Sequence, residues 1–402
     1  MSKKLELNRR QFLKASAQTG TSLAALGRIN FLPQRGVTKP EHAIIFIIDG
    51  LSYKAVDRLD MKNLRSLMAM GTYYEKSYNI LPADPREGEW TKYHTSSMPN
   101  PVILAGTVML RIEQQYVQQS FFPDRITAHA ANDIAYRALN VGFNLSFLHG
   151  SDERPIHDDQ TMYWCLEFLR QAKPAFMKIH LQDTGNAGFI CYEEKNSSVP
   201  WRRDIWAEGS PYVKAALQAD EYLGQFWNEL RALGLEDKTL LFVTADHGQA
   251  DSGWHPFDAE DAWAMPLVVL GPGIRSGQRF DYAEQIDMVP TLCELMGVKP
   301  PKNSSGRVLT EALVNPPENA APRRQTMKAL DILLRDSDAL IKRLQKEAET
   351  SPAAKAQLTE VQRDFYGLDR ILHWYQFGTV DKLMAYDRKV LERVGNSHRP
   401  GG

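Results

Sequence analysis

The sequence predicts an α/β fold in which a mostly parallel central sheet carries helices on both faces, followed by a C-terminal helical appendage. Short apolar segments without alternating polar residues recur from residue 42 onward, as in buried parallel strands. Segments with apolar residues at helical spacing lie between them, which favours alternating strands and helices. Beyond about residue 322 only helical spacing remains. We therefore expect the main domain at 39–315 and the appendage at 322–395.

The expected strands are short, apolar and bounded by turn residues or by the start of a helical pattern. They comprise residues 42–48, 144–148, 175–182, 239–244 and 265–270. Helices are expected where apolar side chains recur every three or four residues. In the main domain these are residues 63–70, 130–139, 211–233 and 290–296.

The appendage begins with a leucine-rich helical stripe. Ser351-Pro352 then resembles an N-cap with proline at the first helical position, and a last helix is expected over 380–394. Packing on the main domain is the favoured role of these helices. A surface for a homodimer is the alternative.

Composition and charge exclude several classes of partner. The chain has 43% hydrophobic and 24% charged residues, and its net charge is −1. No overall field attracts a nucleic acid polymer or an anionic membrane. After the N-terminal segment, no run reaches the roughly 20 apolar residues of a membrane span. Cys165, Cys191 and Cys293 lack CxxC spacing and are expected to be small buried residues.

The N-terminal residues 1–38 are expected to be a signal and linker outside the fold. Asn8 to Lys14 resembles the twin-arginine export signal, and a mildly apolar stretch follows from Ala15 to Leu26. The alternative is a basic helix start. The signal predicts export by the twin-arginine machinery, with a periplasmic or otherwise exported location.

Metal-binding residue types follow three of the expected strands. Asp246 and His247 come two and three residues after 239–244, Asp49 follows 42–48, and Asp183 follows 175–182. Open α/β sheets place their sites at the carboxyl ends of strands, and carboxylate with imidazole suits a divalent metal. The alternative is that each aspartate is a turn residue or helix cap.

A serine-rich segment completes a recognisable set of motifs. The set consists of Asp49-Gly50, Ser97-Met98-Pro99-Asn100, Asp246-His247-Gly248 and Gly271-Pro272-Gly273. It resembles the alkaline phosphatase superfamily over roughly residues 42–310, in particular its type I phosphodiesterase/nucleotide pyrophosphatase and sulfatase-like branches. The resemblance implies an alkaline phosphatase-like fold for the main domain and a metal-dependent hydrolase.

The resemblance also implies roles for individual residues. Ser97 matches the nucleophile, with Ser96 and Thr95 as competitors, and Asn100 matches the asparagine that hydrogen-bonds the substrate oxyanion. One metal site maps fully onto this chain. Its implied ligands are Asp49, Ser97, Asp246 and His247.

A second metal site is only partly matched, so one or two ions are expected. Asp183 matches its aspartate, but the family's Asp-x-x-Gly-His pattern loses its histidine in this chain. Asn186 or His180 as a replacement stays open. His255 matches a later histidine ligand, with proton donation to the leaving group or an ordinary loop position as alternatives.

The nucleophile segment favours phosphate esters over sulfate esters. Sulfatases modify a Cys or Ser within Cys/Ser-x-Pro-x-Arg, whereas this chain has Pro101 at the arginine position. We expect a hydrolase of small anionic phosphate esters, more specifically diesters or pyrophosphates, using zinc, with manganese or calcium as alternatives. The competing hypotheses are a sulfate or phosphonate ester hydrolase, and a catalytically degraded metal-binding protein with a binding or assembly role.

Overall fold

The computed structural model describes most of the chain after residue 37. The described residues are 38–79, 89–97, 115–121, 124–151, 154–256, 259–302, 304–319, 321–366 and 379–396. The twin-arginine motif at 8–14 and the predicted oxyanion residue Asn100 lie outside them. No helix in these ranges is long and apolar enough to cross a membrane.

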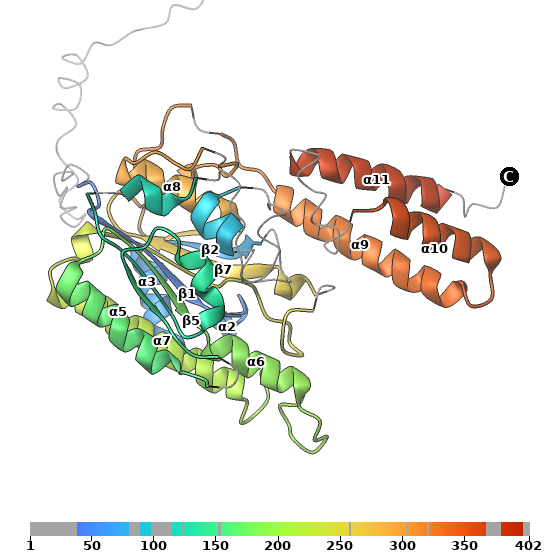
Figure 1. Cartoon of the computed structure of the whole chain (residues 1–402), viewed down its shortest axis with the longest axis horizontal. Helices are drawn as coiled ribbons and strands as arrows, with labels where there is room; N and C mark the ends of the chain where they lie inside the picture. The colour runs from blue at the N-terminus through green and yellow to red at the C-terminus, as the bar shows by residue number, and fades with distance from the viewer. Residues whose placement is uncertain are drawn as a thin grey trace, which may run out of the picture. The chain divides into compact units, whose positions relative to one another are not determined.

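A mostly parallel eight-stranded sheet forms the centre of the main domain (Figure 1). Its order is β4-β3-β5-β1-β6-β7-β2-β8, and only β7 runs antiparallel to its neighbours. The strands are β1 (His42–Ile48), β2 (Thr72–Tyr78), β3 (Thr127–Ala131), β4 (Leu145–Leu148), β5 (Phe176–Leu181), β6 (Thr239–Thr244), β7 (Ala264–Leu270) and β8 (Gln278–Glu284). The predicted fold class is confirmed.

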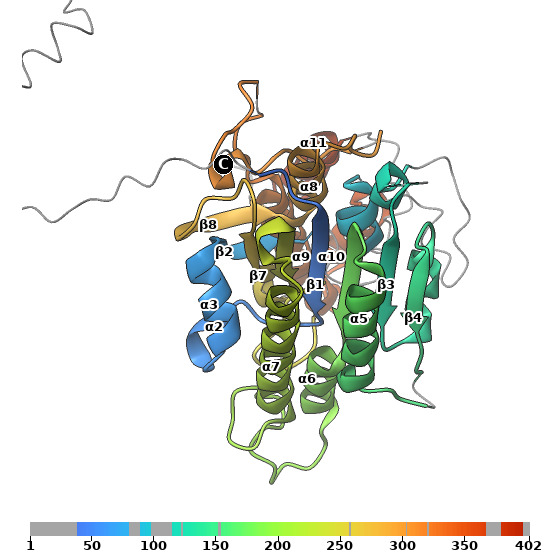
Figure 2. The ribbon, with the colours of Figure 1, turned by 90° about the vertical axis from the view of Figure 1, so that its left-hand side faces the viewer.

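Helices cover both faces of this sheet. Figure 2 looks onto the face that α5 and α7 cover. The α-helices of the main domain are α2 (Ala55–Arg58), α3 (Lys62–Met70), α5 (Asp158–Ala172), α6 (Asp183–Glu193), α7 (Pro211–Ala232) and α8 (Met288–Met296). Short 3₁₀-helices lie at Val117–Phe121, Ile134–Asn140, Glu236–Lys238, Glu260–Ala262, Gln285–Asp287 and Thr310–Ala312.

Alternation along β1 explains why both faces need cover. Ile44, Phe46 and Ile48 pack in one core with side chains of α3, α5 and α7. Ala43, Ile45 and Ile47 point to the opposite core, which includes α8. Side chains alternate between the faces of a strand, so an apolar strand buried on both sides requires two layers of helices.

The predicted helix over 130–139 is wrong. Residues 127–131 form β3, and a 3₁₀-helix follows at Ile134–Asn140. Alanine favours helices, but β3 pairs with both β4 and β5 in the sheet. These neighbours override the local propensity, since Ala128 and Ala130 are fully buried between the layers. Strands β2 and β8 and helices α5 and α6 were not expected from the sequence.

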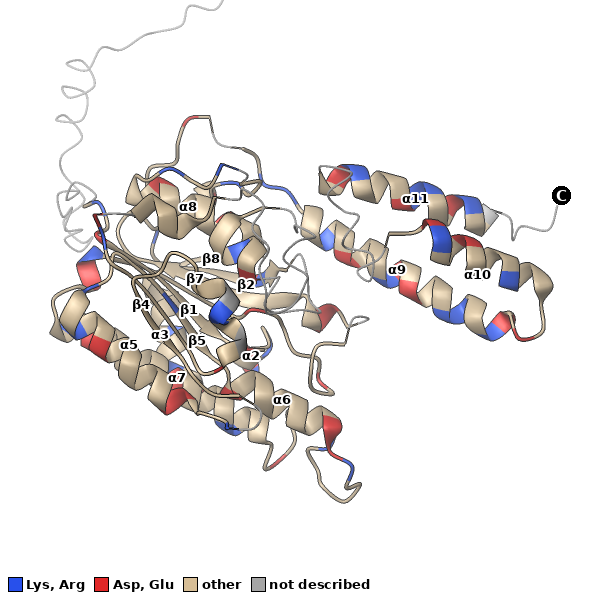
Figure 3. Cartoon of the chain, in the orientation of Figure 1, with Lys and Arg blue, Asp and Glu red and all other residues tan. Residues whose placement is uncertain are grey.

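Helices α9 (Thr326–Glu347), α10 (Pro352–Asp364) and α11 (Val380–Asn396) form the C-terminal part. The Ser351 hydroxyl accepts a hydrogen bond from the Ala354 N–H at 3.2 Å, as the predicted N-cap requires. Figure 3 shows Lys and Arg interspersed with Asp and Glu along these helices. Glu284 of β8 accepts from the Met327 N–H at 3.0 Å and from Arg324 Nε at 2.8 Å, which ties the start of α9 to the sheet.

Asp387 is a buried carboxyl among these helices. It is fully buried on α11 and accepts a hydrogen bond from the Tyr366 N–H at 3.0 Å. Burial raises its pKa to about 7, although that hydrogen bond opposes the shift. Since the folded pKa exceeds the ordinary 3.8, its stabilising contribution falls as the pH rises from about 4 to about 7.

Replacing Asp387 with asparagine should therefore stabilise these helices in alkaline solution. We expect Asp387→Asn to raise the free energy of unfolding by up to ~4 kcal/mol at pH 8, since one pKa unit corresponds to about 1.4 kcal/mol. The gain should shrink toward zero as the pH falls to 4. Urea unfolding at several pH values, with the exposed Asp336→Asn as control, measures it. A gain that does not depend on pH would contradict the assignment.

Candidate metal and nucleophile site

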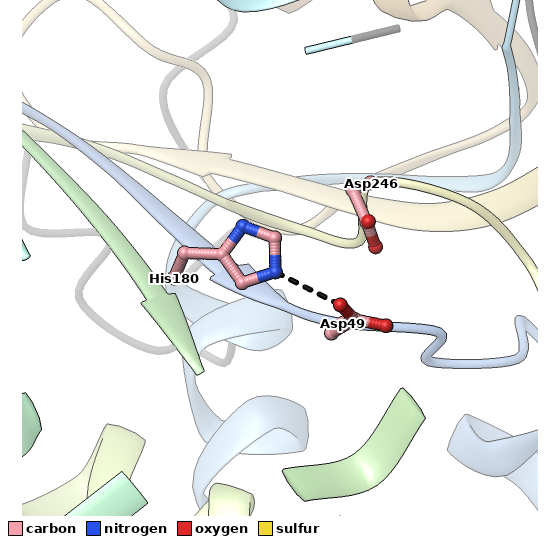
Figure 4. Close-up of side chains that lie close together, drawn as sticks. All are labelled: Asp49, His180 and Asp246. Carbon is pink, nitrogen blue, oxygen red and sulfur yellow. Dashed lines mark hydrogen bonds and ion pairs between the residues drawn. The ribbon is translucent and has the colours of Figure 1, made fainter. Parts of the chain in front are cut away.

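Three buried side chains meet where the central strands end. Asp49 follows β1, Asp246 follows β6, and His180 lies near the end of β5 (Figure 4). One ligand-type atom from each lies within 4.8 Å of the others. Ile47 of β1 pairs in register with both His180 and Thr244. The parallel register therefore brings these strand ends to one place, as expected for an open α/β sheet.

His247 faces the same carboxylates. Its Nε2 lies 3.5 Å from Asp49 Oδ1 and 3.7 Å from Asp246 Oδ2. Its Nδ1 lies 2.7 Å from the Gly248 carbonyl oxygen. Because a carbonyl only accepts hydrogen bonds, Nδ1 carries a proton there, and Nε2 is the nitrogen available to a metal.

The two carboxylates suit a divalent cation. Burial and the charge of Asp246 raise the pKa of Asp49. Burial also opposes ionisation of Asp246, but His247 and His180 hold its pKa below the usual value. Gly50 N–H and His247 N–H donate to Asp246 Oδ1 at 3.1 and 3.0 Å. Its buried Oδ2 has no hydrogen-bond partner among the described residues, so it is a free oxygen ligand for a hard cation.

A glycine of α6 makes room for Asp49. A Cβ atom added to Gly185 would lie 1.7 Å from Asp49 Oδ1. Any other residue at this position would push the carboxylate out of the cluster. The first turn of α6 therefore packs its bare backbone against a candidate metal ligand.

Glu89 supports His180 from behind. The Glu89 carboxylate forms ion pairs with His180 Nδ1 and with Lys178 Nζ, and all three residues are fully buried. Burial alone would raise the pKa of Glu89, but the charges of Lys178 and His180 lower it below its ordinary value. A carboxylate behind a histidine fixes the orientation of its ring, so Nε2 of His180 points at Asp49, 3.0 Å from Oδ2.

The segment before Ser97 is attached to the end of β6. Residues Trp90–Thr95 form a π-helix. π-helices are rare in proteins, and those that occur often lie at functional sites. Lys92 Nζ donates to the Asp246 carbonyl, and Tyr93 OH donates to the Ala245 carbonyl at 2.7 Å. Burial lowers the pKa of Lys92 to about 8. These bonds hold the nucleophile segment beside the strand that supplies Asp246.

The hydroxyls of Thr95, Ser96 and Ser97 make different hydrogen bonds, and Ser97 as nucleophile stays a prediction. Ser96 has a left-handed backbone, with φ of 50°, and its hydroxyl donates to the Ile286 carbonyl at 2.5 Å. That bond gives Ser96 a structural task. Ser97 Oγ lies 2.7 Å from Thr95 Oγ1, and Ser97 is 4% exposed. Thr95 also donates to the Trp90 carbonyl at 3.1 Å, which leaves its oxygen free to accept from Ser97.

The Asp183 carboxylate makes its contacts at the start of α5. Its Oδ2 accepts from the Asp158 N–H at 3.1 Å, and its Oδ1 lies 3.3 Å from His157 Nδ1. Asp158 in turn accepts from the Gln182 N–H at 2.7 Å. The two aspartates thus cap the starts of α5 and α6 reciprocally. His180 takes the place beside Asp49, and a ligand role for Asp183 stays a prediction.

His255 lies next to the cluster without belonging to the Asp49–His180–Asp246 group. The centres of the His255 and His247 rings are 4.1 Å apart. Burial and the neighbouring His247 lower the pKa of His255 to about 3, so its imidazole is neutral. Whether it binds a metal stays a prediction.

The sequence contains a signal for Lys178, which was not expected in the site, and for His180, which was left open. Lys178 and His180 are two ionisable residues, two positions apart, inside a fully buried strand. That spacing puts both on one face, which indicates a buried charge partner. Glu89 has no comparable local signal.

Residues 112–298 match the sulfatase family model, described as Sulfatase. This match covers somewhat less than half of the chain. Arylsulfatase K of Xenopus laevis is 32% identical over 128 residues, which are 30% of this chain and 23% of that protein. N-acetylglucosamine-6-O-sulfatase of Bacteroides thetaiotaomicron is 29% identical over 120 residues, 28% of this chain and 22% of that protein. The chain thus covers less than a quarter of the length of either relative.

Solved structures share the fold of the main domain. A 2-O GAG sulfatase has a TM-score of 0.57 at 16% identity, covering 71% of this chain and 76% of its own. A phosphonate monoester hydrolase from Silicibacter pomeroyi has a TM-score of 0.54 at 16% identity, covering 71% and 78%. The predicted alkaline phosphatase-like fold is confirmed.

Removing Glu89 should weaken metal binding. The test is made in a Lys178→Met background, because removing Glu89 alone would leave the buried Lys178 ammonium without its carboxylate partner. In this background we expect Glu89→Ala to lower the affinity for zinc about 10- to 100-fold. Glu89→Gln should lose less, because its amide oxygen can still face His180 Nδ1. Competition with a chromogenic chelator measures the affinity, and thermal unfolding of the metal-free variants controls for folding. Equal zinc affinity in the Ala and Gln variants would show that Glu89 does not orient His180.

Proposed function

We propose that the chain is an exported, metal-dependent hydrolase of small anionic esters with Ser97 as nucleophile. The buried cluster of Asp49, His180, Asp246 and His247 carries this proposal, because its oxygen and nitrogen donors fit a divalent cation. A bound cation supplies Lewis acidity and lowers the pKa of a coordinated hydroxyl. Zinc best fits mixed carboxylate and imidazole donors, with manganese or calcium as alternatives.

Ser97 Oγ would form a bond to the phosphorus or sulfur of the ester, and the alcohol would leave with a proton. Water would then cleave the bond between Ser97 and phosphorus or sulfur and restore the hydroxyl, releasing a phosphate monoester from a diester, a phosphonate from a phosphonate ester or sulfate from a sulfate ester. Thr95 Oγ1, 2.7 Å away, holds the Ser97 hydroxyl in place. Asn100 is proposed to donate to the developing oxyanion.

Two ester classes compete. The absence of arginine at Pro101 supports an unmodified serine and phosphodiester or pyrophosphate substrates. The sulfatase family match supports sulfate esters, and the fold shared with a phosphonate monoester hydrolase keeps phosphonate esters in the set. We further propose a periplasmic location through the twin-arginine motif at 8–14.

Turnover of a nitrophenyl ester panel tests this function. Zinc-loaded protein is assayed on 4-nitrophenyl phosphate, bis(4-nitrophenyl) phosphate and 4-nitrophenyl sulfate. We expect Ser97→Ala to lower kcat at least about 1,000-fold on the preferred ester, and chelation of the metal to abolish turnover reversibly. Ser96→Ala is the matched control and should lose only stability.

The preferred ester decides between the two classes. Turnover that survives Ser97→Ala would refute the nucleophile assignment. A preference for 4-nitrophenyl sulfate would overturn the phosphodiester reading. No turnover on any ester by fully zinc-loaded protein would favour a non-catalytic metal-binding role.

A further inference from the structure

An aromatic ledge formed by Trp254, His255 and Phe189 extends from the metal cluster. The Trp254 ring centre lies 4.1 Å from that of His255 and 4.6 Å from that of Phe189. His255 in turn lies 4.1 Å from His247, which faces both carboxylates of the cluster. Ring contacts therefore lead without interruption from a candidate metal ligand to α6.

The ledge runs from the interior to the surface. His255 is 7% exposed, Trp254 is half-buried, and Phe189 is 42% exposed. Ile190, the next residue of α6, is 50% exposed. A partly exposed apolar surface beside a polar site is typical of a place where a ligand binds.

The backbone at Trp254 is strained. Its φ is 62°, a left-handed conformation that costs a bulky residue about 1–2 kcal/mol. The Ala250 N–H donates to the Trp254 carbonyl at 3.0 Å, and the Gly253 N–H donates to the Ala250 carbonyl at 2.9 Å. A Cβ atom on Gly253 would lie 2.4 Å from the Gly188 carbonyl oxygen. The turn is thus pressed against α6, and such strain is concentrated at functional sites.

We propose that this ledge is a substrate subsite, with Trp254 stacking on a flat ring next to the ester group. The inference rests on the proposed function and specifies its substrate class. The substrates carry the scissile ester on or beside a ring, either an aryl ring or the C–H face of a saturated sugar-like ring. Stacking on an aromatic face adds to the area it buries, so esters of short alkyl chains gain nothing from it.

Binding of non-hydrolysable phosphonates tests the ledge without requiring turnover. Zinc-loaded full-length protein is titrated calorimetrically with phenylphosphonate, cyclohexylphosphonate and methylphosphonate. We expect the ring compounds to bind about tenfold more tightly than methylphosphonate. Trp254→Ala should remove this advantage and leave methylphosphonate binding unchanged, and Trp254→Phe should retain most of it. The two ring compounds separate aryl from saturated-ring substrates.

Trp164→Ala is the matched control. Trp164 is 41% exposed on α5 and stacks on Phe147, so its loss should change none of the three affinities. The proposed subsite would be wrong if Trp254→Ala kept the preference for the ring compounds. It would also be wrong if a folded variant lost affinity equally for all three phosphonates. If wild-type protein binds none of the anions, the proposed anion site itself fails and the subsite fails with it.

Discussion

Two carboxylates buried against each other are the constraint on which this site depends. Asp49 and Asp246 are almost completely removed from water, and a buried charge without a partner costs several kcal/mol. The imidazoles of His180 and His247 lie beside these carboxylates and stabilise their charge. Backbone N–H groups also donate hydrogen bonds to Asp246 Oδ1. Only the position of β1 between β5 and β6 lets all of these side chains reach one point.

The same constraint explains the polar residues behind the cluster. A fixed His180 needs Glu89, and a buried Glu89 needs the positive charge of Lys178. Each added charge thus requires the next one, until the chain of ion pairs is complete inside the sheet. The family match covers 112–298 and therefore includes His180 and Asp246. It does not include Asp49, Glu89 or Ser97, so part of this site lies outside the matched residues.

Residues that follow apolar strands were easier to predict than Lys178 and His180 inside β5, whose spacing indicates a buried charge partner but does not identify it. Asp49, Asp246 and His247 were found because strand ends of a parallel sheet converge. His180 was left open because its approach to Asp49 depends on the register between β1 and β5. Asp183 also follows a strand, but it opens α6 and its carboxylate is used at the start of α5. Glu89 depends on long-range packing that no local pattern encodes. For the fold, tertiary pairing outweighed alanine propensity in β3.

The missing side chain at Gly185 makes the residues at positions 49 and 185 depend on each other in evolution. Asp49 can occupy its place only while residue 185 has no side chain. A larger residue at position 185 would displace the Asp49 carboxylate. Once Asp49 is replaced by a smaller residue, position 185 no longer has to be glycine. Drift at these two positions should therefore be correlated, and Gly185 would indicate a retained metal centre even in a descendant whose other motifs have faded.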